Sequence, residues 1–444
     1  MSSSQGLYVV VPRRKGQTGI VEARLAALDR FYGVAAARSE PEHDDADLAA
    51  IVGRLGCHED APLVCWGQPF GTAAPNSFDL LVANDLQLRD LTSGWGMAVA
   101  RHGSSVRLIT APSGPIAGYH AESADFEVWA SHAVAAAWLA HGSVAIDAER
   151  IPELLGYDFV GGGRSLVAGV SALPPATLCE ISAGRAASRC YWSQDERWSP
   201  LPADEAQAHG ERWLLRTLEQ RVQGAPQIAL ALTGGADSRV LAVALDELGV
   251  PASGFTWGEP EWPDVTGASA VAAALGMPWS SGVSWRAEAQ TRPAFDAEVR
   301  WADGCAEIAP SSRTWPAGAG ALVIGAAGEV GRAFYYRGDM NRPAPADPIG
   351  IANLLYPEGR LPHATDEAKA AARAAVERWA ASALESGRSG WEAMDVLYAE
   401  QRVSHWSRTQ IPRISADYVG GFMPVEVMRA LASLPLAAKL SDGF

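Results

Sequence analysis

The chain has 444 residues, of which 48% are hydrophobic, and it carries a formal net charge of −15 at pH 7. This length favours two or three domains, while the lack of an apolar run of about 18 residues and of a signal-peptide pattern argues against membrane insertion and secretion. The acidic balance argues against a nucleic-acid partner, because phosphate binding needs clustered cations. We therefore expect a cytoplasmic protein that holds any anionic ligand through a local arrangement of donors.

Short apolar runs separated by Gly and Pro dominate the first part of the chain. The runs at 7–11, 96–100 and 106–110 are typical of strands, the segment 131–140 is typical of a helix, and strand and turn signals return at 165–181. This mixture predicts a layered α+β domain.

A polar connection that contains two prolines, 193–205, follows these elements. Such composition is typical of a domain boundary. We place the first domain at residues 1–197 and the second at residues 198–444.

Apolar runs alternate with helical patterns in the second domain. Strands are predicted at 228–232, 252–257 and 321–326, and helices at 239–248 and 268–275. This alternation predicts an α/β fold with a parallel sheet and covering helices.

Two further helices are expected nearer the C-terminus. The alanine-rich segment 365–385 has Thr365 as a plausible N-cap, followed by two acidic residues in the first turn. The segment 428–440 has the pattern of an amphipathic core helix.

The junction after the strand at 228–232 carries the most informative motif, TGGADSR at 233–239. Its two glycines let the backbone approach a ligand closely. The hydroxyls of Thr233 and Ser238, together with the amides that open the next helix, offer donors to a phosphate. The carboxylate of Asp237 then requires a divalent cation between itself and the phosphates.

The motif differs from the G-x-x-x-x-G-K-[ST] and G-x-G-x-x-G phosphate loops, and it closely resembles the S-G-G-x-D-S loop of the ATP pyrophosphatases. That resemblance implies cleavage of ATP to AMP and pyrophosphate. It also implies that the nucleotide contacts the residues of this junction, which are Leu232, Thr233, Gly234, Gly235, Asp237, Ser238 and Arg239.

Further segments resemble the asparagine synthetases. FTW at 255–257 corresponds to the strand that lines the adenine in that family, and ASAVAAALG at 268–276 to its next helix. GAAGEVGR at 325–332 stands where the family has a second loop, G-x-G-[AS]-D-E. The resemblance implies ATP and Mg²⁺ as cofactors, with Phe255, Thr256 and Gly325 at the nucleotide and Asp237 and Glu329 at the metal ion.

The first domain resembles the glutaminase half of the same family, which is an Ntn-hydrolase sandwich. The likeness lies in SGWGMAVARHGSSVRLITAPSGPIAGY at 93–119 and GRSLVAGVSALPP at 163–175. A working glutaminase uses an N-terminal cysteine that is exposed after removal of the initiator Met, whereas this sequence has Ser2. We therefore expect a degenerate Ntn-hydrolase-like domain without glutaminase activity.

Relatives without that cysteine include β-lactam synthetases, carbapenam synthetases and lasso-peptide macrolactam cyclases, which adenylate a carboxylate that an amine then attacks. The resemblance implies an AMP-forming carbon–nitrogen ligase that acts on a peptide or small-molecule carboxylate. Ala326 replaces a Tyr that β-lactam-forming relatives use together with a Glu, for which Glu400 is the candidate by position. We therefore rank macrolactam closure in lasso-type peptide biosynthesis above β-lactam formation, with room for a peptide-maturation partner protein.

The catalytic cation is a separate question. The family uses a Lys beyond a K-L-x-D-G stretch, which corresponds here to KLSDG at 439–443, just before Phe444. Lys439, or Arg332 beside the second loop, is therefore the candidate for stabilising charge at the adenylate. Two alternatives stay open: ammonia-dependent amidation of a small acid, and a nucleotide-binding pseudoenzyme that recognises a peptide or partner protein.

Overall fold

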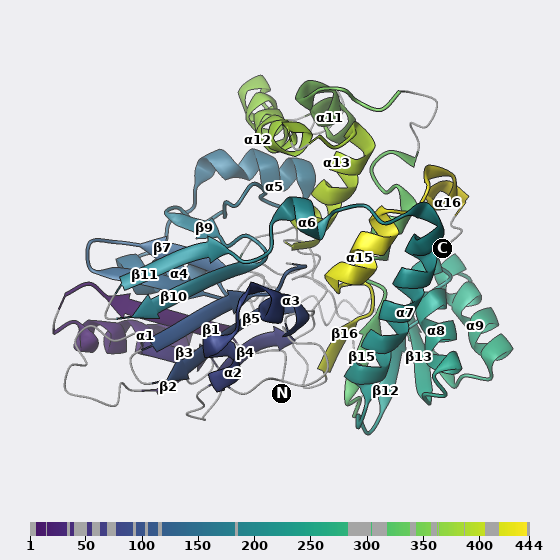
Figure 1. Cartoon of the computed structure of the whole chain (residues 1–444), viewed down its shortest axis with the longest axis horizontal. Helices are drawn as coiled ribbons and strands as arrows, with labels where there is room; N and C mark the ends of the chain where they lie inside the picture. Colours follow the sequence, from purple (N-terminus) through teal and green to yellow (C-terminus); the bar gives the residue numbers. More distant parts are fainter. Residues whose placement is uncertain are drawn as a thin grey trace.

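The computed structural model describes residues 6–14, 16–32, 36–39, 51–55, 63–68, 77–91, 95–102, 105–113, 118–182, 185–282, 303, 318–337, 343–356, 362, 364–385, 387–404 and 417–441. These residues form an N-terminal half with two antiparallel sheets and a C-terminal half with a parallel sheet (Figure 1). The predicted succession of a mixed antiparallel half and a parallel α/β half is confirmed at this level. None of the described helices is both long and apolar enough to cross a membrane.

The N-terminal half consists mainly of runs of consecutive strands, which helices interrupt. Its strands are β1 (Gly6–Pro12), β2 (Ala36–Ser39), β3 (Ile51–Leu55), β4 (Leu63–Gln68), β5 (Trp95–His102), β6 (Ser105–Thr110), β7 (Tyr119–Glu122), β8 (Phe126–Ala130), β9 (Val170–Ala172), β10 (Thr177–Ser182) and β11 (Arg185–Cys190). Its helices are α1 (Thr18–Tyr32), α2 (Ser77–Val82), α3 (Asp85–Leu91), α4 (Ala133–His141) and α5 (Ile151–Tyr157). The strand orders in the two sheets are β2-β3-β1-β8-β7-β9 and β11-β10-β6-β5-β4.

The alternation of side chains along the strands explains how these sheets stack. Leu7 and Val9 of β1 lie in the same buried cluster as Met97 of β5. Tyr8, between them, lies instead in the cluster formed with α1 and α4, and Ala98 of β5 lies in the cluster formed with α2 and α3. Because successive side chains of a strand point to opposite faces, the two sheets face each other and the helices cover the outside, which makes four layers.

The C-terminal half is built around one sheet. The short helix α6 (Gln194–Arg197) lies in the connection that leads into this half. The elements of the C-terminal half are α7 (Ala203–Val222), β12 (Ile228–Ala231), α8 (Ala236–Glu247), β13 (Ala252–Trp257), α9 (Pro263–Leu275), β14 (Trp279–Gly282), β15 (Ala321–Ile324), the 3₁₀ helix η4 (Gly328–Arg332), α11 (Pro348–Leu355), α12 (Asp366–Glu385), α13 (Gly390–Leu397), the π-helix η6 (Tyr398–Val403), β16 (Asp417–Gly420), α15 (Val425–Ala432) and α16 (Leu436–Ser441). All pairs in the order β14-β13-β12-β15-β16 are parallel, as predicted. The edge strands β14 and β16 were not predicted, because their sequences, WSSG and DYVG, lack the continuous apolar run that marks the equally short β12 and β15.

The order of the strands creates a switch point in this sheet. From β12 the chain passes through α8 to β13 on one side, and it later returns to β15 on the other side of β12. In open parallel sheets, ligands bind beyond the carboxyl ends of the strands at the place where the order reverses. The motif that follows β12 and the loop that follows β15 both start at this place.

The predictions for the C-terminal helices succeed in one case and fail in the other. The Ala368 N–H donates to Thr365 Oγ1 at 3.2 Å, so Thr365 is the N-cap of α12 as expected. The single helix expected at 428–440 is wrong, because the structure has α15 and α16 with Pro435 between them. Proline removes a backbone donor and disfavours helical geometry in the residue before it, so the helix ends there.

Candidate functional site

The loop after β12 is held together by its own hydroxyl groups. Ser238 Oγ accepts the Thr233 N–H at 3.0 Å and lies 3.1 Å from Thr233 Oγ1, and the Gly235 N–H donates to Thr233 Oγ1 at 3.0 Å. The two hydroxyls predicted to face a phosphate therefore also close the loop. Their contacts fix the shape of the loop without a ligand. This favours binding, because less conformational entropy is lost when the ligand binds.

A close approach between two glycines fixes the loop against α9. A Cβ atom on Gly267 of α9 would lie 2.6 Å from the Gly234 Cα, and one on Gly234 would lie 3.0 Å from the Pro263 carbonyl oxygen. Sequence reasoning attributed Gly234 to ligand approach alone, and it gave no role to Gly267. The packing of loop against helix adds a second requirement for glycine at position 234.

The loop after β15 packs directly on Asp237. A Cβ atom on Gly325 would lie 2.9 Å from the Asp237 Cβ, and one on Gly328 would lie 2.5 Å from Asp237 Oδ1. Ala327 and Ala333, on either side of η4, have positive φ angles of 76° and 52°. A non-glycine residue in this region costs on the order of 1 to 3 kcal/mol and such residues cluster at functional sites, so the tertiary structure holds this loop in a strained shape.

The two loops bring their charged side chains together. Arg332 Nη2 lies 2.7 Å from Asp237 Oδ2 and 3.9 Å from Glu329 Oε1. All three side chains are largely buried, with exposed fractions of 23% for Arg332, 12% for Asp237 and 24% for Glu329. The two predicted metal carboxylates therefore lie close enough to share one cation, which in this structure is the Arg332 guanidinium.

This pair of carboxylates fits the requirements of Mg²⁺ only in combination with a ligand. Magnesium is usually held by one or two carboxylates together with substrate phosphates and water, and Asp237 and Glu329 supply the carboxylates. Among the described residues, no group of three or more His, Cys, Asp or Glu could hold a metal ion alone. A magnesium ion here would depend on phosphate oxygens and on movement of the Arg332 guanidinium.

Tyr398 is a member of this cluster that sequence reasoning missed. Its hydroxyl donates to Glu329 Oε2 at 2.9 Å from the first position of the π-helix η6. Burial, followed by the nearby Glu329 carboxylate, raises the pKa of Tyr398 well above its usual value, so the phenol stays protonated and donates. The sequence gives little indication of this contact, because Tyr398 is separated from Glu329 by about 70 positions. The π-helical turn is a structural signal for it, because such turns recur at functional sites.

The residues expected at the adenine side lie on neighbouring parallel strands. The Leu232 N–H donates to the Phe255 carbonyl oxygen at 3.0 Å, and Thr256 Oγ1 donates to the Leu232 carbonyl oxygen at 2.6 Å. Thr256 also accepts the Trp279 indole N–H at 2.9 Å. The side chains of Phe255 and Thr256 are buried, so they shape the carboxyl end of β13, and contact with a base stays a prediction.

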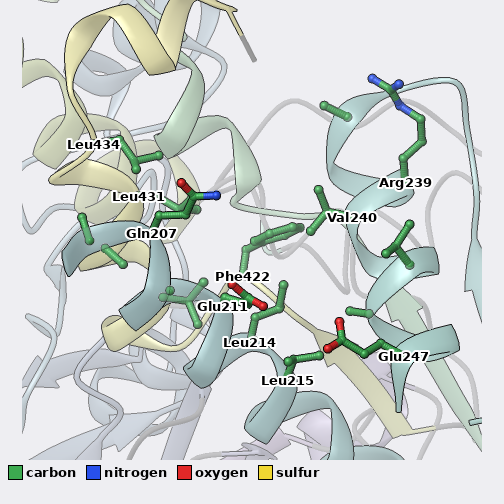
Figure 2. Close-up of a pocket in the computed structure, with 17 residues that line it drawn as sticks. Gln207, Glu211, Leu214, Leu215, Arg239, Val240, Glu247, Phe422, Leu431 and Leu434 are labelled. Carbon is green, nitrogen blue, oxygen red and sulfur yellow. The ribbon is translucent and has the colours of Figure 1, made fainter. Parts of the chain in front are cut away.

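The described contacts of Arg239 do not include this cluster of carboxylates. It is exposed, and its Nε donates to the Gly235 carbonyl oxygen at 3.4 Å. Figure 2 shows its guanidinium at the rim of a cavity of about 440 Å³ between α7, α8 and α15, where Leu214, Val240 and Phe422 are among the lining residues. That cavity is mainly apolar, so it does not resemble a phosphate site, and a nucleotide contact of Arg239 stays a prediction.

The structure places Glu400 in a buried ion pair with Arg197 of the segment that connects the two halves. Its carboxylate accepts hydrogen bonds from Arg197 at 2.5 Å, from the Trp198 indole at 2.6 Å and from the Gln194 side chain. Glu400 is 6% exposed and Arg197 is 3% exposed. The described contacts of Glu400 therefore belong to the connection between the halves, and its catalytic role stays a prediction that these contacts do not support.

Lys439 is also engaged in a buried ion pair. Its Nζ donates to Asp395 Oδ2 and to the Ala432 carbonyl oxygen, each at 2.6 Å, and the Tyr336 hydroxyl donates to the same carboxylate at 3.0 Å. Among its described partners, none belongs to the loops after β12 and β15. Of the two candidate cations, Arg332 is the one that lies beside Asp237. Ser2, which stands where a glutaminase has its cysteine, lies outside the described residues.

Comparisons with known proteins add little to this geometry. No protein-family model matches the chain, and no curated protein is similar to it. Solved structures that are similar include glutamine phosphoribosylpyrophosphate (PRPP) amidotransferase from B. subtilis complexed with ADP and GMP, with 10% identity over 72% of this chain and 74% of that chain and a TM-score of 0.25. Another, described as the allosteric regulatory enzyme of purine biosynthesis, has 10% identity over 76% and 77% and a TM-score of 0.27. Because these TM-scores are so low, neither likeness carries an argument about fold or function.

Proposed function

We propose that this chain is an ATP-dependent, AMP-forming carbon–nitrogen ligase. A substrate carboxylate would attack the α-phosphorus of ATP, forming an acyl-adenylate and releasing pyrophosphate. An amine would then attack the acyl carbon, forming the amide and releasing AMP and a proton. The observation that carries this proposal is the meeting of the TGGADSR loop and the Gly325–Arg332 segment at the switch point between β12 and β15.

The residues of the two loops would have separate tasks in this reaction. The amides at the start of α8 and the loop hydroxyls would hold phosphate oxygens, and Asp237 and Glu329 would hold Mg²⁺. The ion would neutralise charge on the phosphates when bound. Tyr398 would orient Glu329 through the 2.9 Å hydrogen bond, and Arg332, displaced from the carboxylates, would stabilise charge at the leaving pyrophosphate.

The finer parts of the proposal rest on the sequence resemblance. They are a degenerate Ntn-hydrolase-like first half, an ATP-pyrophosphatase-like second half, and macrolactam closure on a peptide carboxylate in the cytoplasm. The four layers of the N-terminal half, with sheets inside and helices outside, are compatible with the first of these. The five parallel strands of the C-terminal half are compatible with the second.

The proposal is tested by pyrophosphate release. Purified protein is given ATP, Mg²⁺ and a panel of peptides that have a free carboxylate and a free amine, and AMP, pyrophosphate and amide are measured. We expect release that depends on a peptide and is lost in Asp237→Ala, while the exposed Asp246→Ala on the same helix keeps the wild-type rate. A wild-type rate in Asp237→Ala with unchanged circular dichroism would refute the assignment of this loop.

One observation favours a second candidate, a nucleotide-binding pseudoenzyme. Arg332 neutralises the carboxylates that would hold the metal ion, and Lys439 forms an ion pair with Asp395. A pseudoenzyme would bind ATP without Mg²⁺ and release no pyrophosphate with any peptide. A ligase would require the metal ion for tight binding and would turn over with at least one peptide.

A further inference from the structure

A second cavity lies between the two halves of the molecule, apart from the loops after β12 and β15. Its volume is about 580 Å³, and its walls come from the Gly162–Arg164 and Ala172–Pro175 segments of the N-terminal half and from α12 and η6 of the C-terminal half. Cavities of roughly 300 to 1,000 Å³ are typical of small-molecule sites. Its size admits an organic molecule as large as a short peptide and is far more than an inorganic anion needs.

The lining of this cavity is cationic although the whole chain is acidic. It contains Arg164, Arg197 and Arg378, with Glu400 as the acidic residue. Arg197 is neutralised by Glu400 at 2.5 Å, and Arg164 is paired with Glu153 at 2.8 Å. Arg378, which is exposed on α12, forms no direct ion pair among the described residues, and only the longer-range negative charge of Glu153 acts on it. Because Glu153 is already paired with Arg164, the surroundings of the cavity keep a net positive charge.

Electrostatics around the cavity agree with this count. Burial is the main cause of a lowered pKa for Arg164; Glu153 opposes that effect, and the charges of Arg150 and Arg378 add to it. Arg378 and Arg164 are therefore near enough to repel each other. An anion between them would relieve this repulsion, and low-dielectric walls of one sign concentrate a ligand of the opposite sign.

The remaining walls suit the carbon skeleton of such an anion. Trp379 adjoins Arg378 on α12, Ser382 lies one turn further on, and the Pro174–Pro175 turn lies among the residues of the N-terminal half. Trp379 offers a flat apolar surface, while Ser382 offers a hydroxyl. Arginine binds carboxylates through a planar fork of donors.

We propose that this cavity binds an organic acid, with its carboxylate at Arg378 and Arg164 and its carbon skeleton against Trp379. The inference does not rest on the ligase reaction, because it concerns binding in the absence of ATP. The same cavity is joined to the candidate nucleotide site by η6, which places Glu400 and Gln401 in the cavity wall and Tyr398 on Glu329.

The test uses three probes with the full-length protein and no nucleotide: the tripeptide acid acetyl-Ala-Phe-Ala, its C-terminal amide, and inorganic phosphate. Affinity is measured by calorimetry at low and high salt. We expect the acid to bind and its amide to bind about tenfold more weakly or worse, because the amide lacks the charged group that accepts hydrogen bonds from the arginines. High salt should weaken the binding of the acid, because it screens the same charges. Phosphate that binds as tightly as the acid, or no binding of the acid, would overturn the proposal.

Two exposed positions provide variants that leave the core intact. Arg378→Ala should weaken the binding of the acid about tenfold or more. Ser382→Trp should fill the cavity and prevent binding without changing any charge. Arg212→Ala, which removes the same charge from an exposed position on α7, should bind as the wild type does. Equal affinity in Arg378→Ala and wild type would overturn the assignment. Failure of the ligase reaction with intact acid binding would instead point to an error in the proposed function.

Discussion

At the scale of single residues, Arg332 links the two carboxylates on which the candidate site depends. Its guanidinium lies 2.7 Å from Asp237 and 3.9 Å from Glu329. Without this cation, two largely buried carboxylates that lie so near one guanidinium would repel each other. Arg332 therefore stabilises the ligand-free site and competes with a metal ion for the same oxygens.

Replacing Arg332 should separate these two effects. Arg332→Ala is expected to slow pyrophosphate release roughly ten- to a thousandfold, as when one charge-stabilising donor is lost, and Arg332→Lys should restore only part of the rate. The same alanine variant should bind Mn²⁺ more tightly than the wild type when no nucleotide is present, because its carboxylates are no longer neutralised. Unchanged Mn²⁺ affinity would show that the guanidinium does not compete, and Arg212→Ala serves as the charge control.

Asp395 is the residue that should make stability depend on pH. Burial raises its pKa to about 6 from 3.8, against the opposing effects of Lys439 and Tyr336. A carboxyl whose pKa is higher in the folded state binds more protons there, so its contribution to stability is full below pH 3.8 and is lost as the pH rises through 6. Wild type should lose about 2 kcal/mol more than Asp395→Asn between about pH 4.5 and about pH 7.5. Parallel pH profiles of denaturant unfolding for the two proteins would contradict this.

At the scale of elements, the approach of α9 to the loop after β12 depends on two facing glycines. A side chain on Gly267 would meet the Gly234 backbone at 2.6 Å, where no flexible group can move aside. The loop and the start of α8 would have to shift together. This contact connects the packing of a helix with the position of the amides that would face a phosphate.

Gly267→Ala is expected to destabilise the protein by about 1 to 3 kcal/mol, as overpacking of a tight contact does. It should also weaken ATP binding, because the loop is displaced. Gly19→Ala in α1 is the matched control, since a Cβ atom there meets nothing within 4 Å, and it should be neutral or stabilising by up to roughly 1 kcal/mol. Calorimetry with ATP and chemical unfolding check both variants, and wild-type affinity in Gly267→Ala would speak against the coupling.

At the scale of the whole molecule, the connection between the halves is part of their interface. Arg197 and Trp198, just before α7, bind Glu400 of η6, while Tyr157 and Phe159 share a buried cluster with α11, α12 and α13. Figure 1 shows α5 of the N-terminal half beside α12. The halves are therefore joined by packed side chains and a buried ion pair as well as by the chain itself.

Breaking this buried ion pair should cost far more than breaking an exposed one. Arg197→Ala leaves the Glu400 carboxylate without its cation and is expected to cost about 3 to 5 kcal/mol. The double variant Arg197→Met/Glu400→Leu should recover much of that loss, since it buries no unpaired charge. Arg189→Ala, from the half-exposed pair with Asp85, should cost less than about 1 kcal/mol. Equal unfolding midpoints for Arg197→Ala and Arg189→Ala would show that the pair does not hold the halves together.

Local signals in the sequence are sufficient for the central strands of the parallel sheet, for the N-cap of α12 and for the two loops of the candidate site. Apolar runs predict β12, β13 and β15, residue type indicates the cap at Thr365, and the loop motifs single out Asp237 and Glu329. Each of these depends on residues that are neighbours along the chain. The single helix predicted at 428–440 is wrong because Pro435 interrupts a segment whose apolar period continues on both sides of it.

Tertiary structure alone decided which of the candidate residues meet. Arg332 reaches Asp237, whereas Lys439 is held by Asp395 and Glu400 by Arg197. Such pairings join positions that are tens to hundreds of residues apart, and the electrostatic free energy of a pair depends on distance and burial, which residue type does not encode. The sequence by itself therefore determined the chemistry available at each loop, and the packing of the two loops at the switch point decided which charges share it.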